Sequence, residues 1–138
     1  MHLKTILFII SFFCFAGTAL AQNSAPLADS SMVYVKKIQD SKLPVLIDFW
    51  AEWCGPCRIL NPTIQELKKE YDGKVKVLKV NVDRNQQLSA HFQVRSIPVV
   101  YLIKNNEAVE RVIGLNKKEA YKEIIEKHLP KKEAEKES

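Results

Sequence analysis

Two cysteines three residues apart are the part of this chain best suited to chemistry. Cys54 and Cys57 stand in the sequence Trp-Cys-Gly-Pro-Cys, between an apolar run at Val45–Trp50 and an amphipathic run that begins at Arg58. The first run predicts a buried strand and the second a helix, so the cysteines would lie at a strand-to-helix turn. The N-terminus of a helix stabilises a thiolate through its free N–H groups and the positive end of its dipole. This context predicts a redox pair, with Cys54 at the helix start and Cys57 about one turn along, close enough to close a small disulfide.

The start of the chain predicts an export signal, which we place at residues 1–21. The basic start Met1–Lys4 precedes the apolar stretch Ile6–Phe15, and Ala19-Leu20-Ala21 has the small-x-small form of a signal-peptidase site. We therefore expect cleavage after this triplet and a periplasmic mature protein that begins at Gln22. The alternatives are secretion and an uncleaved membrane anchor, although the apolar stretch is shorter than the roughly 20 residues that span a bilayer.

Cleavage would also remove Cys14, so the mature chain would contain only the two cysteines of the pair. Small exported domains that are stapled by disulfides carry about four to eight cysteines, so stability here must come from a packed core. The 46% of hydrophobic residues is ample for one. Structural zinc is disfavoured because the chain has no second Cys-x-x-Cys and no histidine pair at ligand spacing. We expect no metal and no cofactor.

The formal net charge of +5 does not indicate a nucleic-acid partner. Basic residues alternate with acidic ones, as in Lys68-Lys69-Glu70 and Lys117-Lys118-Glu119. A nucleic-acid footprint needs clustered lysines and arginines without acids between them. We interpret these stretches as solvated faces, and we expect a monomer that binds no nucleic acid.

Hydrophobic periodicity predicts one domain over residues 31–129. Residues 22–30 are polar and would be mobile, and the charged residues 130–138 would form a disordered tail. The first predicted element is a helix over 31–41 with Met32, Val35 and Ile38 on its apolar face, or alternatively a strand at Met32–Val35. A strand over 45–50 and a helix to about 71 follow, and the helix has Ile59, Ile64, Leu67 and Tyr71 on its apolar face. The remaining elements are a strand over 75–82, a short helix over about 83–92, a hairpin with strands 99–103 and 108–113, and a helix to about 129. One strand–helix–strand crossover joined to a hairpin predicts an α/β fold with a mixed four-stranded sheet and helices on both faces.

Residues 44–129 resemble the thioredoxin family. The stretch Val45–Cys57 is close throughout to the active-site signature of the bacterial members. Arg95-Ser96-Ile97-Pro98 falls where the family has its cis-proline, and Gly114 falls where it has a glycine before the last helix. A lone Cys-x-x-Cys is weak evidence, whereas these motifs together at family spacing are strong evidence. The resemblance implies a thioredoxin fold, with a fifth strand in the sheet if part of residues 22–31 replaces the first strand of the family.

The resemblance also implies thiol–disulfide exchange, in which Cys54 is the nucleophile and Cys57 resolves the mixed disulfide. Asp48 corresponds to the buried acid of the family, which transfers a proton. Its apolar surroundings should raise its pKa, and a solvated acid at the edge of the sheet is the alternative. Lys79 corresponds to the lysine that tunes this acid, although from its strand position alone it could equally face solvent. The residues that would contact substrate are Trp53, Gly55, Pro56, Ile97, Pro98 and Gly114.

The direction of electron flow is the open question. Gly55-Pro56 between the cysteines and Ile97 before the proline resemble the reducing members, so we expect a reductase of protein disulfides. An oxidase or isomerase on the same fold, and a non-catalytic binding module, are the alternatives. A reductase in an oxidising compartment would need electrons from a membrane thiol donor, and its partners would be exported proteins that contain disulfides.

Overall fold

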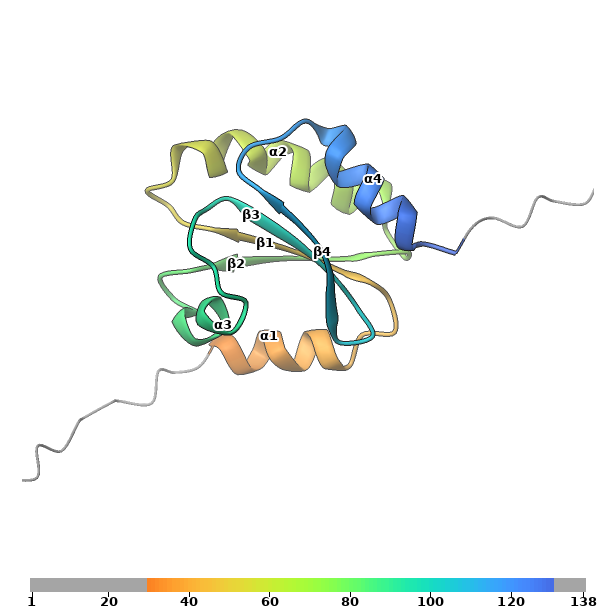
Figure 1. The fold of residues 1–138 in the computed structure, drawn as a ribbon, viewed down its shortest axis with the longest axis horizontal. Coiled ribbons are helices and arrows are strands. Elements are labelled where there is room, and N and C mark those ends of the chain that lie inside the picture. Colours follow the sequence, from red (N-terminus) through yellow and green to blue (C-terminus); the bar gives the residue numbers. More distant parts are fainter. Residues whose placement is uncertain (1–29, 131–138) are drawn as a thin grey trace, which may run out of the picture.

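The structure is a computed structural model that describes residues 30–130. The predicted export signal, the other residues up to 29 and the residues from 131 onward lie outside the described residues, and so does any fifth strand predicted for them. The elements are α1 (Ser30–Gln39), β1 (Val45–Trp50), α2 (Gly55–Glu70), β2 (Lys76–Asn81), α3 (Gln86–His91), β3 (Val99–Lys104), β4 (Glu107–Ile113) and α4 (Lys118–His128) (Figure 1). None of the helices within residues 30–130 is long and apolar enough to cross a membrane.

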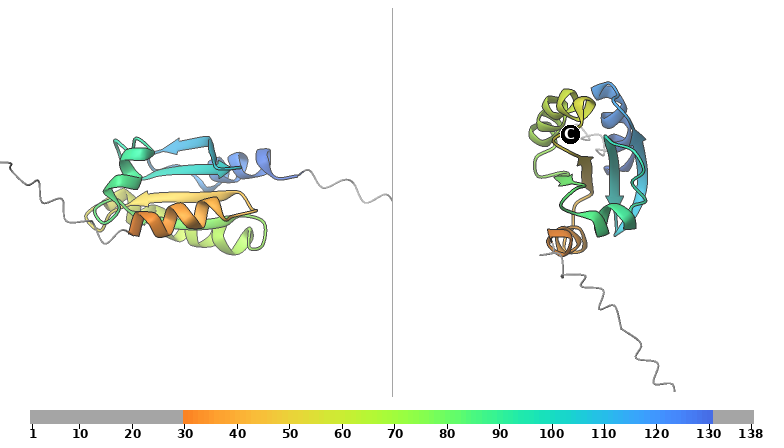
Figure 2. Two further views of the ribbon diagram at one scale, coloured as in Figure 1. Left: turned by 90° about the horizontal axis from the view of Figure 1, so that it is seen from below. Right: turned by 90° about the vertical axis from the view of Figure 1, so that its left-hand side faces the viewer.

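The strands of the described region form one mixed sheet in the order β2-β1-β3-β4. β1 pairs with β2 in parallel, whereas β3 is antiparallel to both β1 and β4. Helices α2 and α4 cover one face of the sheet, and α1 and α3 cover the other (Figures 1 and 2). This arrangement confirms the predicted α/β fold with a mixed four-stranded sheet.

β1 is a central strand, and both of its faces are covered by helices. Val45, Ile47 and Phe49 pack in a core cluster that includes Ile38 of α1 and Leu88 of α3. On the other face, Leu46 packs in a cluster with Leu60, Ile64 and Leu67 of α2 and with Tyr121 and Ile125 of α4. A strand that is buried on both faces must be apolar on both faces, which explains the nearly unbroken apolar run. Asp48 is the exception to this pattern, because it brings a carboxyl group into the buried strand.

Two helices bury different side chains from those that periodicity predicted. α1 excludes the alternative of a strand at Met32–Val35, but Met32 is 62% exposed and Ser31 is buried in its place. In α2, Ile59 is 65% exposed, and Leu60 joins the core instead. The buried side of α2 is formed by Cys57, Leu60, Ile64 and Leu67.

The turns agree with the residue types that form them. Asn105 and Asn106 connect β3 to β4 with φ angles of 53° and 66°. Asparagine tolerates positive φ, so the predicted hairpin forms without a glycine. Gly114 follows β4 with a φ of 78°, a conformation that other residues adopt only under strain. The element boundaries differ from the predicted ones by no more than about three residues, as is usual at frayed ends.

The two isoleucines of α2 provide a matched test of this packing. Ile64→Ala removes a fully buried side chain from the α2–α4 face and should lower the free energy of unfolding by about 2–5 kcal/mol. Ile59→Ala makes the same chemical change at an exposed position and should cost less than about 0.5 kcal/mol. Urea unfolding of the two oxidised variants measures both effects. Equal losses would contradict the assigned orientation of α2.

Candidate active site

The two cysteines lie where β1 ends and α2 begins. Cys54 is the N-cap residue of α2, in an extended conformation, and Cys57 belongs to the first turn. They form a disulfide with their Cα atoms 5.3 Å apart, and the Cys57 N–H donates a hydrogen bond to Cys54 Sγ at 3.2 Å. Pro56 occupies a first-turn position where its missing N–H costs no helical hydrogen bond. When the pair is reduced, a thiolate on Cys54 would therefore receive an N–H donor and the positive end of the helix dipole.

The pair is enclosed by residues from several elements. Both cysteines are buried with Ala51, and Trp50, Val82 and Ile97 pack against this small cluster. The Ile97–Pro98 peptide bond is cis, as the family resemblance implied. The Gly114 N–H donates to the Pro98 carbonyl oxygen at 2.8 Å, which joins the end of β4 to this loop. The fold thus brings the cysteines together with Ile97, and it links Pro98 to Gly114.

Trp53 stands at the rim of the site and is 68% exposed. Its indole Nε1 donates to Asp83 Oδ2 at 3.0 Å. Trp53 follows β1 and Asp83 follows β2, and the ends of parallel strands meet at the same edge of a sheet. Asp83 was not among the predicted site residues, although its place after the second parallel strand was a usable signal.

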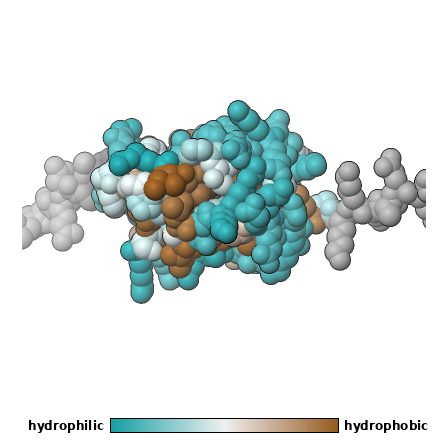
Figure 3. All heavy atoms as spheres, turned by 90° about the horizontal axis from the view of Figure 1, so that it is seen from above, coloured by the Kyte–Doolittle hydropathy of each residue, from teal (hydrophilic) through white to brown (hydrophobic). Residues whose placement is uncertain are grey.

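Apolar side chains also lie at the rim of the site. Trp53 and Ile97 line a shallow pocket together with Val82 and Val94. Ile59 of α2 and Leu115, which follows Gly114, are also exposed. Figure 3 looks onto the face formed by α2 and α4 and shows an apolar patch toward the end where α2 begins. An exposed apolar rim of this kind suits contact with another polypeptide.

Asp48 is buried on β1, with 1% of its surface exposed. Its Oδ1 atom has no hydrogen-bond partner within the described part of the chain. Burial raises the pKa of its carboxyl group from 3.8 to about 6, and the positive charge of Lys79 opposes this rise. The alternative of a solvated acid at the edge of the sheet is therefore excluded. A carboxyl group with a pKa of about 6 can both accept and release a proton near neutral pH.

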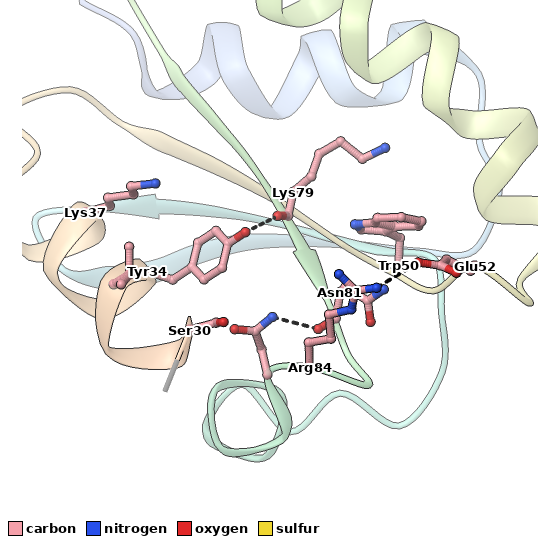
Figure 4. Close-up of a pocket in the computed structure, with 10 residues that line it drawn as sticks. Ser30, Tyr34, Lys37, Trp50, Glu52, Lys79, Asn81 and Arg84 are labelled. Carbon is pink, nitrogen blue, oxygen red and sulfur yellow. Dashed lines mark hydrogen bonds and ion pairs between the residues drawn. The ribbon is translucent and has the colours of Figure 1, made fainter. Parts of the chain in front are cut away.

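Lys79 is the register partner of Asp48 on the neighbouring strand β2. Its ammonium group donates to Asn61 Oδ1 of α2 and lies 4.7 Å from the centre of the Trp50 ring. Its main-chain carbonyl accepts a hydrogen bond from the Tyr34 hydroxyl at 2.9 Å, which ties α1 to β2. Figure 4 shows the Lys79 side chain extending away from α1 beside the Trp50 indole. Lys79 is therefore half-buried and bonded to α2, although it also lines an open pocket.

Asn61 was not among the predicted site residues. Its signal was its spacing, because it lies four residues after Cys57 and so on the same side of the helix. No group of three or more His, Cys, Asp or Glu residues in the part of the chain that the structure describes is placed to hold a metal ion.

Comparison with known proteins gives one consistent family. The thioredoxin family model matches residues 25–127. The chain is 48% identical to thioredoxin of Rickettsia felis over 103 residues, which cover 75% of this chain and 96% of that protein. It is 42% identical to thioredoxin 1 of a Nostoc species over 106 residues, which cover 77% and 97% of the two chains. Thioredoxin of a Synechocystis species is 41% identical over 100 residues, which cover 72% and 94%.

The burial of Asp48 predicts a pH-dependent cost to stability. Because its pKa rises from 3.8 to about 6 on folding, the native state binds more protons than the unfolded state between these pH values. Its contribution therefore becomes less favourable as the pH rises through this window, by about 3 kcal/mol in all at about 1.4 kcal/mol per pH unit. Asp48→Asn removes the titration. The variant should be more stable than the wild type by up to about 3 kcal/mol above pH 6, and the advantage should shrink toward pH 4.

Urea unfolding of the oxidised proteins across this pH range measures the difference. Asp72→Asn is the control, because Asp72 is exposed and its substitution should change stability by less than about 0.5 kcal/mol. A gain at Asp48 that does not depend on pH would contradict the assigned titration.

Proposed function

Because this chain belongs to the thioredoxin family and is a thiol–disulfide oxidoreductase, we propose that it is an exported reductase of protein disulfides. The observation that carries the proposal is the Cys54–Cys57 disulfide at the start of α2, at the end of the strand that holds the buried carboxyl group of Asp48. In the proposed cycle these groups would serve as the reactive sulfur, the resolving sulfur and the proton acceptor, and they belong to two consecutive elements.

The proposed cycle begins with the reduced pair. The Cys54 thiolate attacks a disulfide of the partner protein, forms a mixed disulfide and displaces one partner sulfur as a thiolate. The Cys57 thiol then gives its proton to the Asp48 carboxylate and attacks Cys54 Sγ. The bond between Cys54 and the partner breaks, and the partner leaves with both of its sulfurs reduced. The two electrons come from the cysteine pair, which ends as the disulfide.

Partner proteins would bind at the apolar rim. An extended segment of the partner can pair with backbone groups of the loop that holds Ile97 and Pro98. The residues that we propose to contact it are Trp53, Gly55, Pro56, Ile97, Pro98 and Gly114, with Ile59 and Leu115 at the edge. Docking matters for rate, because holding the partner disulfide in line with Cys54 converts a bimolecular encounter into an oriented reaction.

Export is supported by the start of the chain. The basic residues, apolar stretch and small-residue triplet of residues 1–21 precede the part that the family model matches, which begins at residue 25. We propose a periplasmic protein whose partners are exported proteins with disulfides. The periplasm is oxidising, so the Cys54–Cys57 disulfide would have to be reduced again after each cycle. We propose that a membrane protein supplies the electrons through its own thiols.

A trapping variant tests the exchange reaction and the partners together. In Cys57→Ser the resolving thiol is absent, so mixed disulfides on Cys54 should accumulate. They should be found in the periplasmic fraction, and the captured proteins should include exported disulfide proteins and a membrane thiol protein. The trapped chain should begin at Gln22. Non-reducing gels and mass spectrometry identify the adducts, and Cys54→Ser/Cys57→Ser is the control that should form none. The absence of adducts in cells where the wild type is fully reduced would rule out the proposed cycle.

The reduction potential tests the direction of electron flow. Potentials in this class of proteins extend from about −270 mV for thioredoxin to about −120 mV for a strong periplasmic oxidase, a difference of about 7 kcal/mol. Gly55-Pro56 and Ile97 resemble the reducing members, so equilibration of the pair with dithiothreitol should give a value nearer −270 mV. The pair should also be mostly reduced in cells. A value near −120 mV with an oxidised pair in cells would indicate an oxidase instead.

A further inference from the structure

We infer that Asn61 is a positioning residue for the exchange reaction. Its side-chain oxygen holds the Lys79 ammonium group beside the Trp50 ring, so that Lys79 does not form a direct ion pair with Asp48. The inference rests on the thiol–disulfide exchange activity and is independent of export and of the direction of electron flow.

The backbone alone would favour a direct pair between Lys79 and Asp48. The two residues are register partners on adjacent parallel strands, so their side chains leave the sheet on the same face. Adjacent strands lie about 4.8 Å apart, and the long, flexible lysine stem can easily span that distance. Yet Asp48 Oδ1 has no partner in the described chain, and Lys79 Nζ donates to Asn61 Oδ1 instead. Asn61 of α2 therefore determines where the Lys79 ammonium group lies.

Three contacts specify the position of Lys79. Its main-chain carbonyl is held by the Tyr34 hydroxyl, its ammonium group lies 4.7 Å from the centre of the Trp50 ring, and Asn61 accepts its hydrogen bond. Figure 4 shows the side chain extended beside the indole, on the side of β2 away from Tyr34. The ring attracts the cation without accepting a proton, and the amide oxygen supplies the directional contact. Trp50 and Asn61 are the two side chains that contact the ammonium group, and Asn61 is therefore the one whose loss should release the lysine.

Few other charges act on Asp48. Its register partner on β3 is Val100, and the titratable group facing it from α4 is Tyr121, whose pKa is raised mainly by burial and further by the Asp48 charge. Cys54 and Cys57, at the start of α2, are joined in a disulfide and do not titrate in this state. Within the described chain, Lys79 is the charge that lowers the pKa of Asp48. The position of Lys79 thus decides how strongly Asp48 holds a proton.

This position suits the chemistry of the site. When Cys57 attacks Cys54 Sγ, its proton passes to the Asp48 carboxylate while the bond between Cys54 and the partner breaks. A direct ion pair would stabilise the carboxylate and make it a weaker base, because attraction between charges grows as they approach. A more distant lysine leaves the carboxyl group able to exchange a proton near neutral pH. Asn61 contributes by setting this separation.

Titration of Asp48 in the oxidised protein tests the inference directly. Carboxyl carbon NMR follows the group without interference from cysteine ionisation. Asn61→Ala frees Lys79 to pair with Asp48, so the midpoint should fall by on the order of one pH unit. Asn61→Asp keeps an acceptor for the lysine and should leave the midpoint at or above that of the wild type. Gln65→Ala is the matched control, because it removes an exposed amide one turn further along the same helix.

A double variant shows whether Asn61 acts through Lys79. Lys79→Met should raise the midpoint, and adding Asn61→Ala should then change nothing further. The midpoint is unaffected by whether the protein is a reductase, so failure here is distinct from failure of the proposed function. A midpoint that is unchanged or raised in Asn61→Ala would overturn the inference. So would an effect of Asn61→Ala that persists without the lysine.

Single-turnover kinetics give the corresponding effect on the reaction. The reduced protein is mixed with insulin, and the rate of disulfide formation between Cys54 and Cys57 is followed against pH. The acidic limb of the Asn61→Ala profile should move down with the midpoint, and the rate above it should fall about threefold because the carboxylate is a weaker base. Alanine favours helices, so the variant should fold. Thermal unfolding checks that it does. If it does not fold, the same rate profile is measured for Asn61→Leu, which also lacks the acceptor. Wild-type profiles for both variants would overturn the inference.

Discussion

The carboxyl group of Asp48 lies in the apolar centre of the domain, and much of the structure serves to keep it there. A buried carboxylate is unfavourable, so its strand must be held by packing on both faces and by pairing on both edges. β1 meets these needs, because β2 and β3 flank it and helices cover both of its sides. The same burial raises the pKa of Asp48 to about 6, which suits the proton transfer that we propose for it. The fold thus tolerates a destabilising buried carboxyl group at the residue that we propose as the proton acceptor.

α2 combines three tasks along a single helix. Its N-terminus carries the cysteine pair, its second turn supplies Asn61, and its apolar side supplies Leu60, Ile64 and Leu67 to the core. Ion pairs connect its far end to α4, where Glu70 meets both Lys118 and Lys122. Partly exposed ion pairs such as these each contribute little to the free energy of unfolding. The apolar contacts therefore hold α2 against the sheet. Because these groups share one helix, the packing of that helix on the sheet also fixes where Asn61 lies relative to the cysteine pair.

Much of this could be predicted from the sequence because local patterns dominate it. The apolar run before the cysteines, the second run around Lys79 and the asparagine hairpin each specify their element, and the resemblance at Val45–Cys57 and Ile97-Pro98 specifies the family. The orientation of α1 and α2 was harder to predict. Met32 and Ile59 fit a helical period but face solvent, because neighbouring elements decide which of several apolar stripes is buried.

By itself, the sequence determined the order of the elements, the mixed sheet and the redox pair, since each depends on residue type and short-range spacing. The proton-transfer role that we propose for Asp48 came from the family resemblance. The tertiary structure alone decided which groups meet. Trp53 bonds to Asp83, Gly114 to Pro98, and Lys79 to Asn61, pairs that lie between 16 and 30 residues apart in the chain. Such contacts depend on strand register and helix orientation, which are set by the packing of the whole domain. The position of the Lys79 charge relative to Asp48 is one of these collective outcomes.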